Sequence, residues 1–282
     1  MGKLRHIAFI SKQPKVQSDF YQKYFGFEEC KVFPSGSRMV IDPLFNLAFL
    51  QQAAVSAAVS GTHRADGSET ELTVGIHHYG FLVDNLEQAV AKLPAGLTRG
   101  ANPQISAGVS GPEAARPAEV RFIDPWGNNV DLSSRGYLGR EEKKLPAVRL
   151  LAVQVPDLAA ACEFYQQQFG LEIAGWTDDG TIRLSDGTLT LMLTKSLVRP
   201  RGGVQYFGIQ VSDMTGLKKR LQDGGVAVSD DAKGQIQFDD PEGNRVVVSE
   251  SGWAKCASTV RACPHASVRS EAGLSQPNEP NP

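Results

Sequence analysis

The stretch FYQKYFG at residues 20–26 recurs 144 residues later as FYQQQFG at residues 164–170. The same spacing relates the flanking segments, so residues 6–50 align with residues 150–194 without a gap. Self-similarity at a fixed offset is the sequence signature of a repeated structural unit. The chain is therefore expected to contain two copies of one domain, and this duplication decides the fold.

A second pair of stretches supports the duplication and shows how the copies differ. FIDPWGN at residues 122–128 matches FDDPEGN at residues 238–244, at a shorter spacing of 116 residues. The second copy must therefore have shorter loops. The excess in the first copy is an Ala/Ser/Gly-rich stretch at 52–71 and a Gly/Pro-rich stretch at 103–117. We predict domains at residues 1–137 and 148–253.

The remaining residues, 254–282, differ in composition from both copies. They are polar and rich in proline towards their end, with few apolar residues to bury. Such composition is typical of a disordered segment. We therefore expect a disordered tail after the second domain.

Each copy divides again into two modules with the pattern β-α-β-β-β, which predicts an α+β fold with four modules. In the first module, Val16, Phe20 and Tyr24 are expected on the apolar side of a helix that Gly26 ends. Turn residues separate the predicted strands. The elements predicted for the first copy are strands at 4–10, 28–33, 37–41 and 46–50 around a helix at 14–25, then strands at 75–83, 100–105, 119–123 and 129–133 around a helix at 86–93.

Ligand-type side chains lie on the first or last strands of the two modules in the first copy. His6 lies in LRHIAF, His78 aligns with it in GIHHYGF, and Asp131 lies among apolar residues in NVDL. Because side chains alternate along a strand, we expect His77 on the opposite face, as a surface residue or as support for the site. Two modules side by side should form a cup with these strands on its floor. His6, His78 and Asp131 would then form a metal site of two imidazoles and one carboxylate, with open positions.

Each of these residues also has an ordinary structural explanation. A single histidine in a strand is usually structural, and a single aspartate often caps a turn. Three ligand-type residues at equivalent strand positions favour a metal site, because a carboxylate between apolar neighbours is costly unless it is paired or binds a cation. The second copy has Leu150, Tyr206 and Val247 at the equivalent positions. It keeps the fold pattern without the ligands, which indicates a functional reason for the polar set in the first copy.

These motifs together resemble the vicinal oxygen chelate superfamily, which includes glyoxalases, bleomycin- and fosfomycin-resistance proteins, and extradiol ring-cleaving dioxygenases. The resemblance rests on LRHIA, the FY…FG helix end, GIHHYGF and DPWGNNVD, and it covers roughly residues 4–137 and 148–253. It implies a cup-shaped fold and a small-molecule ligand. It does not select a reaction, since one scaffold hosts many chemistries.

Departures from the family narrow the choice of reaction. Glyoxalase-type isomerases take a fourth ligand from the first module's last strand, where this chain has Ala48 or Leu50. Family members usually end the ligand set with Glu, which is one methylene longer than Asp131. Extradiol dioxygenases share the two-histidine, one-carboxylate set and the four modules, but they usually hold the metal in the second domain. They also carry a Tyr where this chain has Arg121, which is our candidate for contact with a substrate anion.

We therefore predict a metal-dependent enzyme that binds its substrate through adjacent oxygens. Extradiol-type dioxygenase chemistry ranks first, glyoxalase-like isomerase or lyase chemistry second, and simple sequestration of a ligand third. Fe²⁺ is the first choice of metal, with Mn²⁺, Zn²⁺ and Ni²⁺ as alternatives. The resemblance leaves a homodimer open.

Composition limits the partners and the location of the protein. The formal net charge of −2 argues against a nucleic-acid partner, which requires a strong positive field. No apolar run approaches the roughly 20 residues of a membrane helix, and the start of the chain lacks a signal-peptide pattern. The four cysteines are too scattered for a disulfide framework. These features predict a cytoplasmic protein with no membrane partner.

Overall fold

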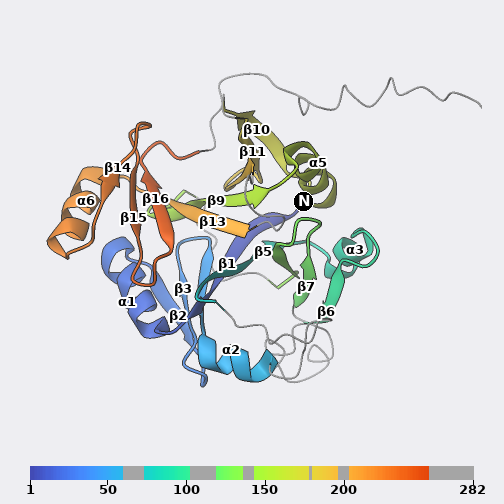
Figure 1. The fold of residues 1–282 in the computed structure, drawn as a ribbon, viewed down its shortest axis with the longest axis horizontal. Coiled ribbons are helices and arrows are strands. Elements are labelled where there is room, and N and C mark those ends of the chain that lie inside the picture. The colour runs from blue at the N-terminus through green and yellow to red at the C-terminus, as the bar shows by residue number, and fades with distance from the viewer. Residues whose placement is uncertain (60–72, 102–118, 136–142, 178–179, 196–202, 254–282) are drawn as a thin grey trace, which may run out of the picture.

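The protein contains two eight-stranded sheets with the same strand order, as the computed structural model shows for residues 1–59, 73–101, 119–135, 143–177, 180–195 and 203–253 (Figure 1). The predicted α+β class is confirmed, since helices flank both mixed sheets. Each half contains two modules of the pattern β-α-β-β-β. The domain limits at 137 and 148 stay a prediction, because residues 136–142 lie outside the described part of the chain, as do residues 254–282.

The first sheet brings the two predicted ligand strands together at its centre. Its order is β2-β3-β4-β1-β5-β8-β7-β6, so β1 and β5 are antiparallel neighbours, and each has a parallel partner on its other side. The elements of this half are β1 (Lys3–Ser11), α1 (Pro14–Phe25), β2 (Glu28–Val32), β3 (Arg38–Ile41), β4 (Asn46–Gln51), α2 (Gln52–Val59), β5 (Gly75–Leu82), α3 (Leu86–Ala91), β6 (Thr98–Ala101), β7 (Glu119–Ile123) and β8 (Asn129–Ser133).

The second sheet repeats this arrangement in the order β10-β11-β12-β9-β13-β16-β15-β14. Its elements are β9 (Ala147–Val155), α5 (Leu158–Phe169), β10 (Glu172–Trp176), β11 (Ile182–Ser185), β12 (Thr190–Lys195), β13 (Gly203–Gln210), α6 (Met214–Asp223), β14 (Ser229–Asp230), β15 (Ile236–Asp239) and β16 (Arg245–Ser249). Strands β9 and β13 occupy the central positions that β1 and β5 occupy in the first sheet. The duplication read from the sequence is therefore also a duplication of topology.

Two local predictions were wrong. Val16 does not lie on the buried side of α1: it is 43% exposed, while the aromatic residues of this helix are buried. The Ala-rich start of the 52–71 stretch forms α2 rather than a loop, since alanine has the highest helix propensity. The strand expected at 100–105 begins at Thr98 and is described as far as Ala101. The whole of the 103–117 stretch lies outside the described residues, as does the 52–71 stretch from residue 60 onward.

The repeated motifs identify contacts between the two halves. The Tyr21 hydroxyl of α1 donates to Asp240 Oδ2 at 3.0 Å, and Asp240 belongs to the DPEGN turn of the other half. In the reciprocal contact, the Tyr165 hydroxyl of α5 donates to Asp124 Oδ2 at 2.5 Å, in the DPWGN turn. Both aspartates also bind backbone N–H groups of their own turns. The repeated FY and DP motifs therefore form two equivalent links, each joining a helix to a turn of the other half.

A second pair of reciprocal links fixes the two central strands. The backbone N–H of Leu4 donates to Asp186 Oδ2 at 2.8 Å, and that of Val148 donates to Asp42 Oδ2 at 2.5 Å. Arg5, next to His6, also forms a buried ion pair with Asp186, with Nη1 and Oδ2 at 2.7 Å. Burial raises the pKa of Asp42 to about 6 against the lowering effect of its backbone hydrogen bonds. The second half therefore holds β1, which carries His6, in place.

One hydrophobic core runs through both halves. It includes buried residues from both sheets and from α1 and α5. Phe81 of β5 stacks on Phe169 of α5 with ring centroids 4.0 Å apart, and Tyr79 bonds to Tyr165 at 2.5 Å between their hydroxyl oxygens. In the described part of the chain, no helix has the length and apolar character needed to cross a membrane. The floor of the first sheet is thus supported by the second half of the chain.

Candidate metal centre

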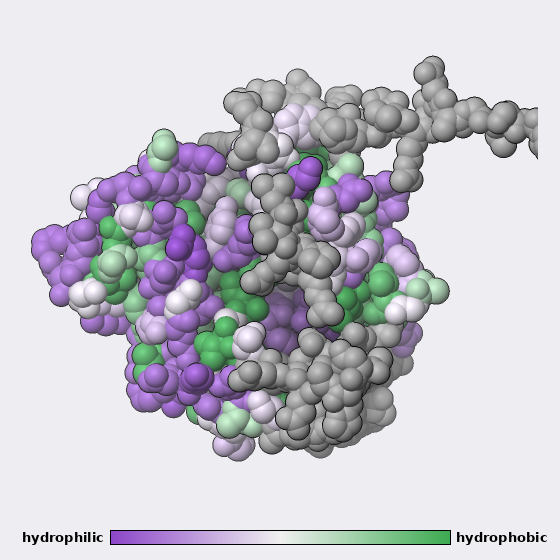
Figure 2. All heavy atoms as spheres, viewed as in Figure 1, coloured by the Kyte–Doolittle hydropathy of each residue, from purple (hydrophilic) through white to green (hydrophobic). Residues whose placement is uncertain are grey.

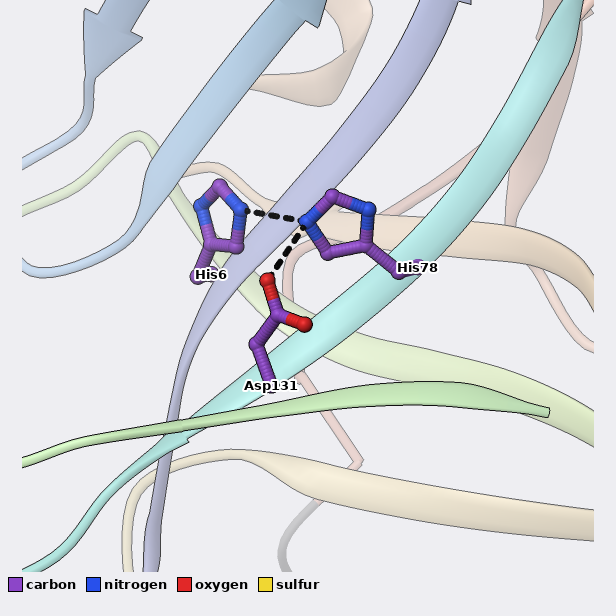
Figure 3. A group of neighbouring side chains, drawn as sticks. All are labelled: His6, His78 and Asp131. Carbon is purple, nitrogen blue, oxygen red and sulfur yellow. Dashed lines mark hydrogen bonds and ion pairs between the residues drawn. The ribbon is translucent and has the colours of Figure 1, made fainter. Parts of the chain in front are cut away.

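The three predicted ligands meet on the floor of the first sheet. His6 of β1, His78 of β5 and Asp131 of β8 are buried, and each offers a ligand atom, all within 4.8 Å of one another. The two Nε2 atoms are 3.2 Å apart, and His78 Nε2 lies 3.1 Å from Asp131 Oδ2 (Figure 3). Figure 2 shows the molecule hollowed near the centre of the view, with hydrophilic residues at the bottom of the hollow. The side chains converge as the strand alignment predicted.

Sheet register explains this convergence. Across the antiparallel pair, Ala8 of β1 lies opposite His78 of β5; across the parallel pair, Gly80 of β5 lies opposite Asp131 of β8. The same relation in the first module pairs Ala8 with Ala48 of β4. Ala48, rather than Leu50, therefore occupies the position equivalent to Asp131. A carboxylate there would be a fourth ligand, and the alanine leaves that side of the group apolar.

Asn46 supports His6, and the sequence reasoning missed it. It lies opposite His6 in the register of β1 and β4, and its Oδ1 is 3.0 Å from His6 Nδ1. An amide oxygen only accepts, so this contact places the proton on Nδ1 and leaves the Nε2 lone pair facing the group. The sequence feature that could have indicated this role is a single asparagine at the start of the otherwise apolar strand NLAFL.

His77 does not point to the opposite face, so that prediction was wrong. Its Nδ1 lies 2.8 Å from His78 Nδ1, and the two rings meet edge to face at 82°. The pairing of β1 and β5 shifts between Ala8 and Phe9, which face His78 and Ile76, so His77 is the extra residue of a β-bulge. A bulge interrupts strict alternation. His77 therefore supports His78, which is one of the two roles predicted for it.

Arg121 contacts the predicted ligands directly. It faces Asp131 across the β7–β8 pair, with Nε donating to Oδ1 at 2.7 Å and Nη2 donating to Oδ2 at 2.9 Å. Nη2 also lies 3.4 Å from His78 Nε2. The Arg121 side chain is 26% exposed, whereas that of Asp131 is fully buried. The guanidinium thus orients the carboxylate from the solvent side of the cup.

The charge states of these residues suit metal ligation. Burial lowers the pKa of His6 and of His78 to about 4, so both imidazoles are neutral near pH 7. Burial alone would raise the pKa of Asp131, but His78 and Arg121 outweigh it and hold the pKa well below its usual range. Metals bind neutral imidazole and ionised carboxylate. The group is already in that form without releasing a proton.

The spacing of the donor atoms also fits a metal ion. Bonds of about 2.1 Å to nitrogen and oxygen place neighbouring ligand atoms about 3.0 to 3.4 Å apart in octahedral or tetrahedral geometry. The separations of 3.2 Å and 3.1 Å lie in this range. His6, His78 and Asp131 could therefore hold a metal ion on one side and leave its other side open.

The second half has an apolar cluster at the equivalent place. Leu150, Val247 and Trp253 are buried together, with Met192 and Tyr206 packed against them. Three of these five residues are the counterparts of the candidate ligands, as predicted from the alignment. Met192 is the counterpart of Ala48, since each lies opposite the equivalent alanine of the first strand. The polar group therefore belongs to the first half alone among the described residues.

Comparison with known proteins supports the fold. Residues 148–248 match the model of the Glyoxalase/Bleomycin resistance protein/Dioxygenase superfamily. Among curated proteins, no sequence match was found. The second half therefore matches a domain of this superfamily, and the first half has the same topology.

Solved structures resemble the whole chain at low sequence identity. The 2,3-dioxygenase LapB from Pseudomonas sp. KL28 gives a TM-score of 0.65 at 15% identity, covering 92% of this chain and 95% of that one. The Mn(II)-bound glyoxalase from Novosphingobium aromaticivorans gives a TM-score of 0.62 at 14% identity, covering 89% of this chain and 83% of that one. Homoprotocatechuate 2,3-dioxygenase from Brevibacterium fuscum, solved with 3,4-dihydroxyphenylacetate, gives a TM-score of 0.62 at 11% identity, covering 89% of this chain and 81% of that one. The two-domain fold is thus shared with proteins of different activities.

Proposed function

We propose that the protein is a metal-dependent oxidoreductase of the extradiol dioxygenase type, which binds an aromatic substrate through two adjacent oxygens. The observation that carries this proposal is the convergence of His6, His78 and Asp131, with ligand atoms within 4.8 Å of one another. Two histidines and one carboxylate with open positions are the ligand set of non-haem Fe(II) oxygenases. Bound there, Fe²⁺ would supply oxygen activation and a Lewis acid for the two substrate oxygens.

The residues of this chain would hold and orient the reactants. Asn46 and His77 fix the two imidazole rings through their contacts at 3.0 Å and 2.8 Å. Arg121 orients Asp131, and its partly exposed guanidinium is also the candidate for contact with the negative charge of a bound diol. A guanidinium carries fixed charge at neutral pH and suits an anionic ligand. It would favour the ionised substrate without itself exchanging a proton.

Glyoxalase-like chemistry is the second candidate, favoured by the likeness to the Mn(II)-bound glyoxalase. Ala48 counts against it, because its position is the one from which a fourth ligand and base would come. The absence of a carboxylate there leaves no group at this position to move a proton. We therefore rank ring cleavage ahead of isomerisation.

The test is oxygen consumption by the full chain after anaerobic loading with Fe²⁺. We expect oxygen uptake with catechol or 3,4-dihydroxyphenylacetate, together with a yellow ring-cleavage product. His78→Ala should abolish both signals, while the matched variant Tyr206→Phe, at the equivalent place in the second half, should retain them. An Fe²⁺-loaded protein that consumes no oxygen with either diol contradicts the proposed reaction. Turnover of a 2-oxoaldehyde thiohemiacetal with Mn²⁺ would support the glyoxalase-like alternative.

A further inference from the structure

The second half contains a cavity of about 290 Å³. It lies over the apolar cluster that stands where the first half has its candidate ligands. We propose that this cavity binds a second small molecule, an aromatic carboxylate, without a metal ion. The proposal is independent of the reaction assigned to the first half. It uses residues that the candidate metal centre does not contain.

The floor of the cavity is apolar and holds an aromatic ring in a fixed position. Met192, Tyr206, Val247 and Trp253 line it. Trp253 lies so close to β13 that a side chain on Gly208 would meet its ring at 2.6 Å, which explains the glycine there. Trp253 Nε1 donates to the Gln235 side-chain oxygen at 3.2 Å, in the orientation of the Gln235 amide that gives both its oxygen and its nitrogen a hydrogen-bond partner. The indole ring is thus held in place, and although it is only 6% exposed, it forms part of the apolar lining that a ligand would contact.

Positive charge surrounds this floor. Arg183, Lys233 and Arg245 line the cavity, against a single described carboxylate, Asp231. Asp231 Oδ1 already accepts two backbone N–H groups of its own turn, those of Lys233 and Gln235, each at 2.8 Å. Arg245 is paired with an aspartate outside the cavity, Asp239, at 2.7 Å. The remaining field in the cavity favours an anion.

Arg183 marks where the anion would lie. Its Nε is buried and has no hydrogen-bond partner among the described residues. It faces Met192 across the β11–β12 pair, so its guanidinium emerges beside the apolar floor. Because this Nε is closed to solvent, a ligand carboxylate would reach the guanidinium at its Nη groups, and among the described residues no carboxylate pairs with Arg183.

The ligand class follows from these two features together. A flat apolar body would pack against the apolar floor while its carboxylate pairs with the Arg183 guanidinium. The volume lies near the lower limit of small-molecule pockets, which allows a ligand of roughly a dozen non-hydrogen atoms. A metal-bound ligand is not expected, since the cluster of metal-ligating side chains found among the described residues lies in the first half.

The experiment is isothermal titration of the full chain with 2-naphthoate, using the neutral alcohol 2-naphthylmethanol as comparator. We expect one naphthoate per chain and at least about tenfold weaker binding of the alcohol, since hydrogen bonds to charged groups are strong. Arg183→Met should weaken naphthoate by about tenfold and abolish the preference for it. Arg220→Met, which removes an exposed arginine of α6 outside the cavity, should change neither value.

Further variants separate this cavity from the first site and from loss of folding. His78→Ala should leave naphthoate binding unchanged, whereas loss of binding there would place the ligand in the first half and overturn the proposal. Trp253→Phe should keep the binding heat and remove the associated quenching of tryptophan fluorescence. Arg183→Lys keeps the charge, so it should bind naphthoate better than Arg183→Met does. Absence of naphthoate binding up to millimolar concentration, or equal affinity in Arg183→Met and wild type, would also overturn the proposal.

Discussion

Replacing Asn46 by leucine should weaken metal binding at the first site without removing a ligand. Asn46 Oδ1 lies 3.0 Å from His6 Nδ1, and Asn46 is only 1% exposed, so water has little access to replace it. In Asn46→Leu the Nδ1 proton loses its acceptor, and the imidazole is free to adopt the other tautomer. Loss of such an outer partner typically lowers metal affinity roughly 10- to 100-fold. This corresponds to about 1.4 to 2.7 kcal/mol.

A chelator competition with Zn²⁺ measures this change directly, because Zn²⁺ needs no protection from oxygen. Thr190→Val is the matched control: Thr190 is buried, and it faces Leu150 as Asn46 faces His6. We expect that control to bind Zn²⁺ as the wild type does. Asn46→Asp should bind at least as tightly as the wild type, since a carboxylate raises the basicity of the imidazole. Equal Zn²⁺ affinity in Asn46→Leu and the wild type would refute the assigned role of Asn46.

Three further changes test the links between the halves and the second floor. Arg5→Met leaves Asp186 buried without its cation and should lower the free energy of unfolding by about 3 kcal/mol. Urea denaturation of this variant, of Asp186→Asn and of the double variant should give a pairwise interaction energy above about 1 kcal/mol, and additive effects of the two substitutions would contradict the buried ion pair. Burial raises the pKa of Asp42 to about 6, so the folded state holds this proton more tightly than the unfolded state, and the stability that the proton contributes is lost as pH rises from about 4 to about 6. Between pH 4 and pH 7 the wild type should therefore lose up to about 3 kcal/mol more free energy of unfolding than Asp42→Asn does. Urea midpoints that change in parallel with pH in the two proteins would contradict this. Gly208→Ala should cost about 1 to 3 kcal/mol in urea, because its methyl would meet the Trp253 ring at 2.6 Å, and an unchanged midpoint would show that the ring moves away.

The sequence was sufficient to predict the fold and the convergence of His6, His78 and Asp131, because both follow from periodic patterns. The repeat at 144 residues and the strand alternation of LRHIAF and GIHHYGF predicted which strands are equivalent. Equivalent central strands bring His6 and His78 together, whatever the loops do. The predicted apolar replacement of the group in the second half followed from the same alignment.

Other features depend on contacts that no local pattern encodes. The β-bulge at His77 is a property of strand pairing, so strict alternation predicted the wrong face. The bidentate contact of Arg121 with Asp131 depends on the register of β7 and β8, and Asn46 acquires its role only through its position opposite His6. Val16 is exposed because the tertiary placement of α1 turns that side of the helix to solvent.

The most direct test of the central claim is the metal content of the purified full chain, measured by elemental analysis after anaerobic loading with Fe²⁺. We expect about one tightly held ion per chain, lost in His78→Ala and retained in Tyr206→Phe, because the only ligand group among the described residues lies in the first half. A wild-type chain that retains no stoichiometric metal would contradict this expectation. So would a His78→Ala chain that retains the ion.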